Sequence, residues 1–249
     1  VSRHLETSFK KRGIDVITSA KVQEIKIGPN GATVTVSTGM DMCAIECEKV
    51  LVAMGVRGNV DGLGLEETGI EIHRDYIAVN EWMETNVSGI YAVGDLTGKL
   101  MLAHVASAQG IVAVESMAGL KPLPLDYVMM PRTVYCRPQI ASSGITEQQA
   151  RETVNDVAVG ISPMMANGKA LAIGKSEGIV KVVSNAKTGE VLGVHMIGAE
   201  VTELVAEAML TRALEGTTIE MGRLVHPHPT ISEALKEAAL ATQSKAIHI

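Results

Sequence analysis

The chain has few aromatic side chains: among 249 residues there are one Trp, one Phe and four Tyr. Stacked rings therefore cannot dominate the core, and we expect the aliphatic residues and the 13 methionines to fill it. Cysteine is scarce as well, with only Cys43, Cys47 and Cys136. Such a small and odd set argues against a disulfide framework and suits the reducing cytoplasm, where we expect the protein to work.

Other absences exclude whole classes of partner. No apolar run approaches the length of a membrane span, and the N-terminus has no signal-peptide pattern, so we expect no membrane contact. A net charge of -6 without any stripe of Lys and Arg argues against nucleic acid. A search for G-x-G-x-x-G fails, because Gly62-Leu63-Gly64 is followed by neither a third glycine nor a helix. What remains is a globular protein, long enough for one large domain or two small ones.

The most informative stretch present is 225–233, Val-His-Pro-His-Pro-Thr-Ile-Ser-Glu. Proline forbids helix, so we expect 226–229 to form a stiff, extended segment that leads into a helix. Thr230 and Glu233 have the T-x-x-E spacing of a capping box at that helix start. The pattern places His228 on a rigid segment beside the Glu233 carboxylate, an arrangement that can carry a proton near neutral pH.

Two alternatives concern the same stretch. Glu233 could serve only to cap its helix. His226-x-His228 also has the spacing of a metal pair, but no cysteine or acidic cluster surrounds it, so we expect no metal.

The first part of the chain predicts a helix over 1–12, ended by Gly13, and a strand over 14–17. A helix that leads to a strand without a preceding strand suggests the end of a βαβ unit. Segments 22–27 and 32–37 alternate around Pro29-Asn30-Gly31, which predicts a hairpin continued by a strand over 45–48. The apolar run 50–55 predicts a buried parallel strand that ends in Gly55.

The middle of the chain predicts a loop over 59–67, a strand pair over 70–79 around Arg74-Asp75, and an apolar strand that ends in Gly94-Asp95. A carboxylate at such a strand end can accept hydrogen bonds from sugar hydroxyls, although an Asp in a turn is the common alternative. A long helix over 101–118 follows. The free N–H groups at its start can bind a flavin ring or a phosphate.

Residues 120–124 read as a linker, after which a separate α+β unit begins. We expect a strand over 134–141, in which the proline marks a bulge or a sheet edge, and a strand over 158–163. We also expect a polar turn over 164–172 and a hairpin formed by 178–183 and 190–197. We expect helices over 146–153 and 200–215, the second with Leu204, Ala208 and Leu214 facing inward, and a short helix capped by Thr217-Thr218.

Together, these motifs resemble the flavin- and pyridine nucleotide-dependent disulfide oxidoreductases. The carriers of the resemblance are His228-Pro229-Thr230-x-Ser232-Glu233, the string Ile90 to Asp95, and the final 124–249 array. The resemblance implies that His228 is the acid/base of thiol–disulfide exchange and that Glu233 holds its imidazole. It also implies that Asp95 holds the ribityl chain of FAD.

The same resemblance extends to the cofactor contacts. It implies FAD contacts at the helix start, at Met101, Leu102, Ala103 and His104. It also implies NAD contacts at Val22 and Gly55. The alternatives are that Val22 is a plain strand residue and that His104 only begins its helix. Leu102-Ala103-His104 is the form seen in lipoamide dehydrogenases and differs from glutathione reductases. The order Gly55-Val56-Arg57 departs from the family's usual Gly-Arg at this position.

The family's redox-active Cys-x4-Cys pair and Gly-rich turns are not in this sequence, and Cys43-x3-Cys47 has the wrong spacing. The resemblance therefore implies the C-terminal portion of a dihydrolipoamide dehydrogenase, inactive alone, with FAD and NAD as cofactors of the whole enzyme. It implies a homodimer that serves the lipoyl domains of 2-oxo acid dehydrogenase complexes. The alternatives are another flavin disulfide reductase and a non-catalytic dimerisation module.

The implied fold class is mixed: the end of an NAD-binding α/β domain, then a central flavin-contacting segment, then an α+β dimerisation domain with an antiparallel sheet and helices. The expected domain ranges are 1–57, 58–123 and 124–249.

Overall fold

A computed structural model describes residues 1–249, the whole of the printed sequence. The chain forms two compact units: one consists of Val1–Arg12 with Asp126–Ile249, and the other of Gly13–Leu125. The expected range 1–57 is thus divided, because its first helix packs with the C-terminal residues. The functional assignment of the three expected domains stays a prediction.

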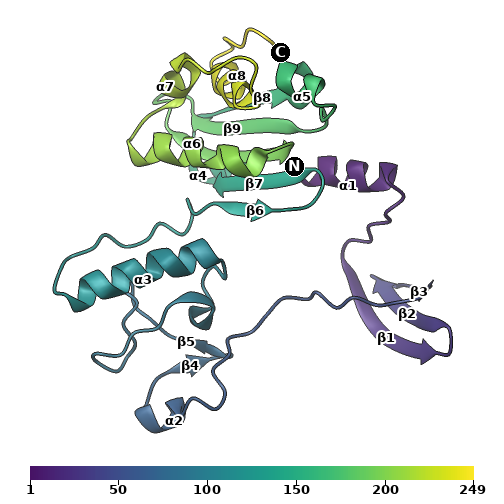
Figure 1. Cartoon of the computed structure of the whole chain (residues 1–249), viewed down its shortest axis with the longest axis vertical. Helices are drawn as coiled ribbons and strands as arrows, with labels where there is room; N and C mark the ends of the chain where they lie inside the picture. Colours follow the sequence, from purple (N-terminus) through teal and green to yellow (C-terminus); the bar gives the residue numbers. More distant parts are fainter. The chain divides into compact units, whose positions relative to one another are not determined.

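The first unit is built on a five-stranded antiparallel sheet with the order β6-β7-β10-β9-β8 (Figure 1). The strands are β6 Arg132–Val134, β7 Gln139–Gly144, β8 Val157–Pro163, β9 Ile179–Asn185 and β10 Val191–Gly198. The predicted hairpin around Lys187-Thr188-Gly189 is confirmed as β9 and β10. Alternation along β9 and β10 turns Val180, Val182, Val194 and Met196 toward one face, which must then be covered.

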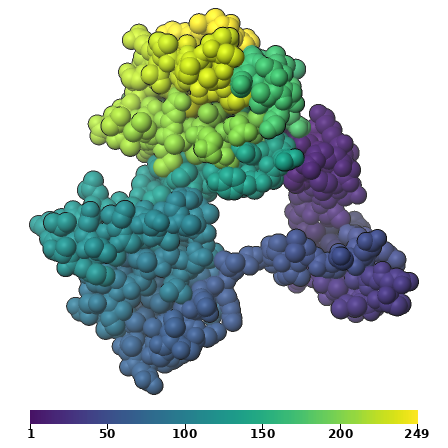
Figure 2. Space-filling view, viewed as in Figure 1, coloured from purple at the N-terminus to yellow at the C-terminus, as the bar shows by residue number.

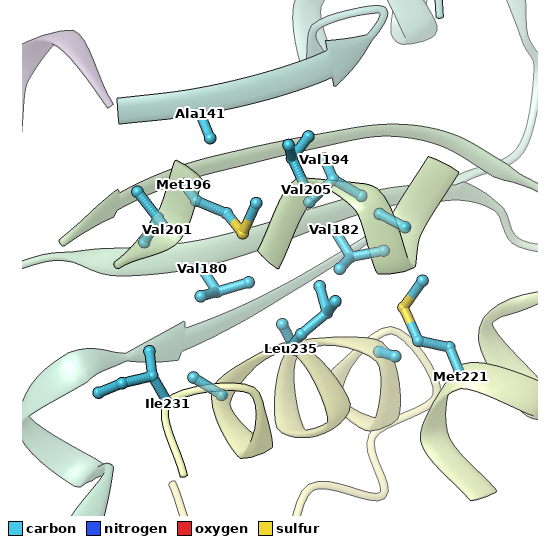
Figure 3. Close-up of a cluster of buried hydrophobic side chains, with 14 of the residues drawn as sticks. Ala141, Val180, Val182, Val194, Met196, Val201, Val205, Met221, Ile231 and Leu235 are labelled. Carbon is cyan, nitrogen blue, oxygen red and sulfur yellow. The ribbon is translucent and has the colours of Figure 1, made fainter. Parts of the chain in front are cut away.

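Three helices cover that face: α6 Val201–Ala213, α7 Thr218–Arg223 and α8 Glu233–Ala241. Figure 3 shows Val201 and Val205 of α6 and Leu235 of α8 meeting the valines of the sheet. Aliphatic and methionine side chains alone make this cluster, as the composition predicts. The remaining helices of the unit are α1 Ser2–Lys11, α4 Glu147–Thr153, the short 3-10 turn η2 Met164–Ala166 and α5 Gly168–Ala172.

Helix α1 joins this unit through polar contacts. The Ser8 hydroxyl donates to Glu177 at 3.1 Å, and the Arg12 guanidinium donates to the Arg137 carbonyl oxygen at 2.7 Å. The helix therefore packs against residues far along the chain.

The second unit holds a three-stranded antiparallel sheet of β1 Ala20–Gly28, β2 Gly31–Thr38 and β3 Asp41–Cys47. Its first hairpin is confirmed, with Gly28 opposite Gly31 across the turn. The remaining elements are α2 Leu65–Thr68, the strand pair β4 Ile72–His73 and β5 Tyr76–Ile77, the 3-10 helix η1 Gly94–Thr97, and α3 Ala103–Met117. The strand pair and the long helix match the predictions for 70–79 and 101–118.

Three predicted strands are absent: 14–17, 50–55 and 90–95. Segment 50–55 is also exposed rather than buried, with Leu51 91% and Met54 86% exposed, and Figure 2 shows this part of the chain as a narrow, uncovered string. A parallel strand exists only when neighbouring strands satisfy its backbone, and no strand of this chain pairs with any of the three segments. Only Tyr91 forms an isolated bridge, with Glu84.

Three further predictions about the first unit are wrong. Residues 134–141 do not form one bulged strand, because the chain reverses at Pro138, which has no N–H to donate, and Val134 pairs with Ile140. Residues 164–172 form η2 and α5 rather than a turn, since the Asn167 side chain caps α5 by accepting the Ala170 N–H. Leu214 is 74% exposed because it lies just past the end of α6.

No helix of the structure is both long enough and apolar enough to span a membrane.

Candidate active site

His228 lies on the irregular segment between α7 and α8, in the first unit. The segment contains no helix, as its prolines predict, and it bends at His228 and Pro229. The His228 side chain is 75% exposed. Its chemistry is therefore open to solvent or to a partner.

The Glu233 carboxylate at the start of α8 binds the His228 ring. The Nδ1–Oε1 distance is 2.9 Å and the Nδ1–Oε2 distance is 3.2 Å. A carboxylate that accepts from Nδ1–H leaves Nε2 with a free lone pair that can accept a proton. Burial alone would raise the pKa of Glu233, but hydrogen bonds from the Thr230 N–H and from His228 outweigh it and lower that pKa. The carboxylate thus stays ionised beside the ring.

The predicted capping box is only half present. Glu233 Oε2 accepts the Thr230 N–H at 2.9 Å, but the Thr230 hydroxyl donates to the Pro227 carbonyl oxygen at 2.7 Å instead of capping α8. The helix begins with Ser232 as its N-cap and without a side-chain cap. The hydroxyl is used inside the His–Pro segment, which fixes that segment rather than the helix.

His226 does not act with His228 as a metal pair. Its side chain is 3% exposed, and its Nε2 lies 2.8 Å from Oε1 of Glu207 on α6. Its Nδ1 lies 3.0 Å from the Leu224 carbonyl oxygen. No group of three or more His, Cys, Asp or Glu side chains in the structure is placed to hold a metal ion.

A cavity of about 280 Å³ adjoins His228 and Glu233. A second carboxylate–imidazole pair lines it, in which His248 Nδ1 lies 3.0 Å from Oε1 of Glu237, one turn further along α8. Glu237 is 5% exposed and also accepts the Ile247 and His248 N–H groups, so it anchors the end of the chain. Burial opposes the ionisation of Glu237, but these hydrogen bonds, the His248 side chain first, lower its pKa.

In the second unit, Asp95 lies in η1 with an exposed side chain that forms no hydrogen bond or ion pair within the chain. A buried amide holds its turn in place: Oε1 of Gln109, on α3, accepts the Gly94 N–H at 2.6 Å, and Gln109 itself is 0% exposed. The Thr97 hydroxyl closes the turn by donating to the Gly94 carbonyl oxygen at 2.9 Å. Asp95 is therefore an unpaired carboxylate on a fixed turn.

The predicted helix start is close to Asp95 in sequence. Leu102 is the N-cap of α3 and provides no side-chain cap; the Leu102 and Val105 N–H groups have acceptors within the chain, and the Ala103 N–H is left without one. Ala103 and His104 are exposed in that first turn, and Met101 is 36% exposed just before it. The Ala103 N–H and the Asp95 carboxylate suit a ligand that carries both hydroxyls and phosphates.

The two predicted NAD residues are not brought together by an ordered sheet. Val22 pairs with Val36 in the β1–β2 hairpin and is 48% exposed. Gly55 has φ +95° in the strand-free segment, and a Cβ added there would meet no atom within 4 Å. The positive φ explains the glycine, but nothing in this chain packs on it.

Three contacts of the two sites were not predicted from the sequence: the Glu207–His226 pair, the Glu237–His248 pair and the Gln109–Gly94 bond. For Gln109 a signal was present, because this long amide lies among small and aliphatic residues, from Val105 to Val114, in the middle of its helix. The two His–Glu pairs join residues 19 and 11 positions apart, at no helical or strand spacing.

Two family models match the chain. Residues 1–110 match the pyridine nucleotide-disulphide oxidoreductase model, and residues 130–239 match the dimerisation domain of the same oxidoreductases. Together they cover most of the chain, on both sides of the linker.

Curated relatives agree. The chain is 45% identical over 250 residues to a dihydrolipoyl dehydrogenase of Bacillus subtilis, covering 100% of this chain and 53% of the relative. It is 48% identical over 239 residues to a dihydrolipoyl dehydrogenase of Mycobacterium leprae, covering 95% and 51% respectively. The chain therefore spans about half the length of the curated relatives it matches.

Solved structures show the same fold. LpdA from Mycobacterium tuberculosis has a TM-score of 0.86 with 30% identity, covering 94% of this chain and 51% of that one. The flavoprotein disulfide reductase RclA from Escherichia coli has a TM-score of 0.87 at 23% identity, covering 96% and 55%, and so supports the fold alone.

Proposed function

Because the chain belongs to the pyridine nucleotide-disulphide oxidoreductases, we propose that it is the C-terminal half of a dihydrolipoamide dehydrogenase. The whole protein would oxidise protein-bound dihydrolipoamide to lipoamide, with NAD+ reduced to NADH and one proton released. The observation that carries the proposal is the His228–Glu233 pair at 2.9 Å, exposed on the unit that matches the dimerisation domain. The similarity to dihydrolipoyl dehydrogenases supports the substrate class.

His228 is the proposed acid/base. The Nε2 lone pair accepts a thiol proton as the substrate thiolate forms and attacks a disulfide, because Nδ1–H already donates to Glu233. The carboxylate then faces an imidazolium, whose positive charge it stabilises across 2.9 Å. The low pKa of Glu233 keeps that countercharge present throughout the neutral range.

FAD fits the residues of the second unit. Asp95 is an unpaired carboxylate on a fixed turn, ready to accept hydrogen bonds from the ribityl hydroxyls. Met101 to His104, at the start of α3, are the other proposed FAD contacts, and the Ala103 N–H is a donor for a polar or anionic part of the group. When bound, FAD would carry the electron pair from the thiols to NAD+. Val22 and Gly55 are the proposed contacts for NAD, and the open space at Gly55 leaves room for a ligand.

We also propose that the protein works as a homodimer and that its macromolecular partners are the lipoyl domains of 2-oxo acid dehydrogenase complexes. The match to a dimerisation domain over 130–239 supports the dimer. The three free cysteines support a cytoplasmic location.

The chain alone is expected to be inactive, because it has no Cys-x4-Cys pair to exchange with the substrate. The test is to assay NADH formation from dihydrolipoamide with this chain and with the full-length protein that contains it. The proposal is supported if the full-length protein forms NADH and this chain does not. NADH formation by the 249-residue chain would show that the reaction does not need a Cys-x4-Cys pair, and would refute this part of the proposal.

One other candidate has an observation in its favour. The dimerisation match also suits a module that only dimerises and binds no flavin. Light scattering and a visible absorption spectrum of the full-length protein separate the two: a dimer without a flavin band would favour the module.

A further inference from the structure

His228 is poorly held by its own surroundings. Its ring is 75% exposed, and its only hydrogen bonds go to Glu233. Packing therefore does not decide where the ring points. The backbone on either side of His228 has to do so.

On the C-terminal side the backbone is well fixed. The Thr230 N–H donates to Glu233 at 2.9 Å, and its carbonyl oxygen accepts from the buried Asn167 amide at 2.9 Å. Thr230 is thereby tied both to α8 and to α5.

On the N-terminal side almost everything is exposed. Leu224 is 52% and Val225 89% exposed, and Pro227 is exposed as well. The exception is the His226 side chain, 3% exposed, which reaches Glu207 on α6 at 2.8 Å and the Leu224 carbonyl oxygen at 3.0 Å. The segment before His228 thus has one buried anchor.

We propose that the His226–Glu207 pair is a positioning device for His228, holding the His–Pro segment on α6 so that the His228 ring keeps its hydrogen bond to Glu233. The role deepens the proposed function, since it assumes that His228 carries the thiol proton. A buried apolar residue would fill the same space. The imidazole instead places each ring nitrogen against an oxygen acceptor, on Leu224 and on Glu207, and these directed contacts fix the angle at which the segment leaves α7.

The first test uses the 249-residue chain itself and measures the His228 ring by long-range 1H–15N NMR. In the unchanged chain we expect one set of His228 ring signals with the proton on Nδ1. His226→Leu keeps an apolar side chain in the buried position but removes both ring nitrogens. In this variant we expect the Nδ1–H tautomer of His228 no longer to dominate, so that the ring signals average between the two tautomers. Glu207→Gln keeps an oxygen acceptor for His226, so its His228 signals should remain close to those of the unchanged chain.

The matched control is His195→Leu. His195 is another imidazole of the same unit, half-buried on β10, with Nε2 2.9 Å from the Ile145 carbonyl oxygen. Its loss costs a half-buried hydrogen bond without touching the His–Pro segment. It should lower the thermal stability by a similar amount and leave the His228 tautomer unchanged.

The second test uses the full-length protein. A misplacement of about 1 Å can cost roughly 100-fold in rate, so His226→Leu should lower kcat about 10- to 100-fold, with KM for dihydrolipoamide within threefold and the FAD content unchanged. His195→Leu should keep kcat within twofold.

An unchanged His228 tautomer in His226→Leu together with kcat within twofold would overturn the proposal. So would an equal loss in His195→Leu, because the effect would then be one of stability. If the full-length protein oxidises no dihydrolipoamide, the proposed function fails, and the tautomer measurement still decides whether His226 positions His228.

Discussion

The close approach of α8 to β8 makes Gly160 the most demanding glycine near the site. A Cβ added to Gly160 would lie 1.9 Å from the Ala238 carbonyl oxygen and 2.7 Å from the Thr242 nitrogen. Both atoms belong to the backbone around the end of α8, so no side chain can rotate away. In Gly160→Ala the helix and the strand must separate by about 1.1 Å before the first contact reaches 3.0 Å.

That movement opens a core that is closed in the native structure. Leu235 and Ala238 of α8 are 0% exposed and pack on the sheet. Overpacked cores lose about 1–3 kcal/mol, and two backbone clashes place this case near the upper end, about 3 kcal/mol. Because Glu233 starts the same helix, the His228–Glu233 pair should be disturbed as well.

The assay must report on each unit separately. Hydrogen exchange followed by mass spectrometry does so, with peptides from β8 and α8 for the first unit and from α3 for the second. A loss of about 3 kcal/mol predicts exchange roughly 150-fold faster in β8 and α8, with α3 unchanged. The control is Gly110→Ala on α3, where an added Cβ meets nothing within 4 Å and should stabilise by about 0.5–1 kcal/mol.

An acceleration below tenfold in Gly160→Ala, equivalent to less than about 1.4 kcal/mol, would refute the reasoning. It would mean that α8 can move on β8 at little cost.

Three further predictions concern Glu237, Gln109 and His228. The folded pKa of Glu237 is depressed, so its contribution to stability is present above the unfolded pKa of 4.5 and is lost as the pH falls through the folded pKa. Glu237→Gln removes this contribution. The free energy of unfolding in urea should therefore fall less steeply below pH 4.5 in the variant than in the unchanged chain. Gln109→Leu leaves the half-buried Gly94 N–H without its acceptor and should destabilise the second unit by about 1–3 kcal/mol, measured by the fluorescence of Trp82, the only tryptophan. A change below about 0.5 kcal/mol would contradict the role of the amide. In the full-length protein, His228→Gln should slow thiol–disulfide exchange with FAD still bound, and unchanged turnover would remove His228 from the mechanism.

Patterns that depend on neighbouring residues could be predicted from the sequence, and those that depend on distant partners could not. The Pro29-Asn30-Gly31 turn fixes its own hairpin, and the spacing of Thr230 and Glu233 fixes their contact. The apolar run 50–55 reads like a buried strand, but it has no partner strand here and lies exposed. Its hydrophobicity suits a buried position, but no other part of this chain buries it.

The site shows the same division. His228 and Glu233 lie within five positions, so one motif predicts both. The contact of His226 was not predicted, because its partner, Glu207, lies on a different helix and no local pattern points to it. Only the packing of α6 beside the His–Pro segment brings that carboxylate to the ring.

The docking of α1 on the C-terminal residues has a consequence for synthesis. The ribosome makes α1 before its binding surface, because residues 13–125, the whole second unit, lie between. At about 5–20 residues per second, roughly 6 to 23 s pass before the first residue of that surface is made, and Glu177 and Arg137 follow later. Until then helix α1 stays exposed to water, and the second unit can fold before α1 reaches its binding surface.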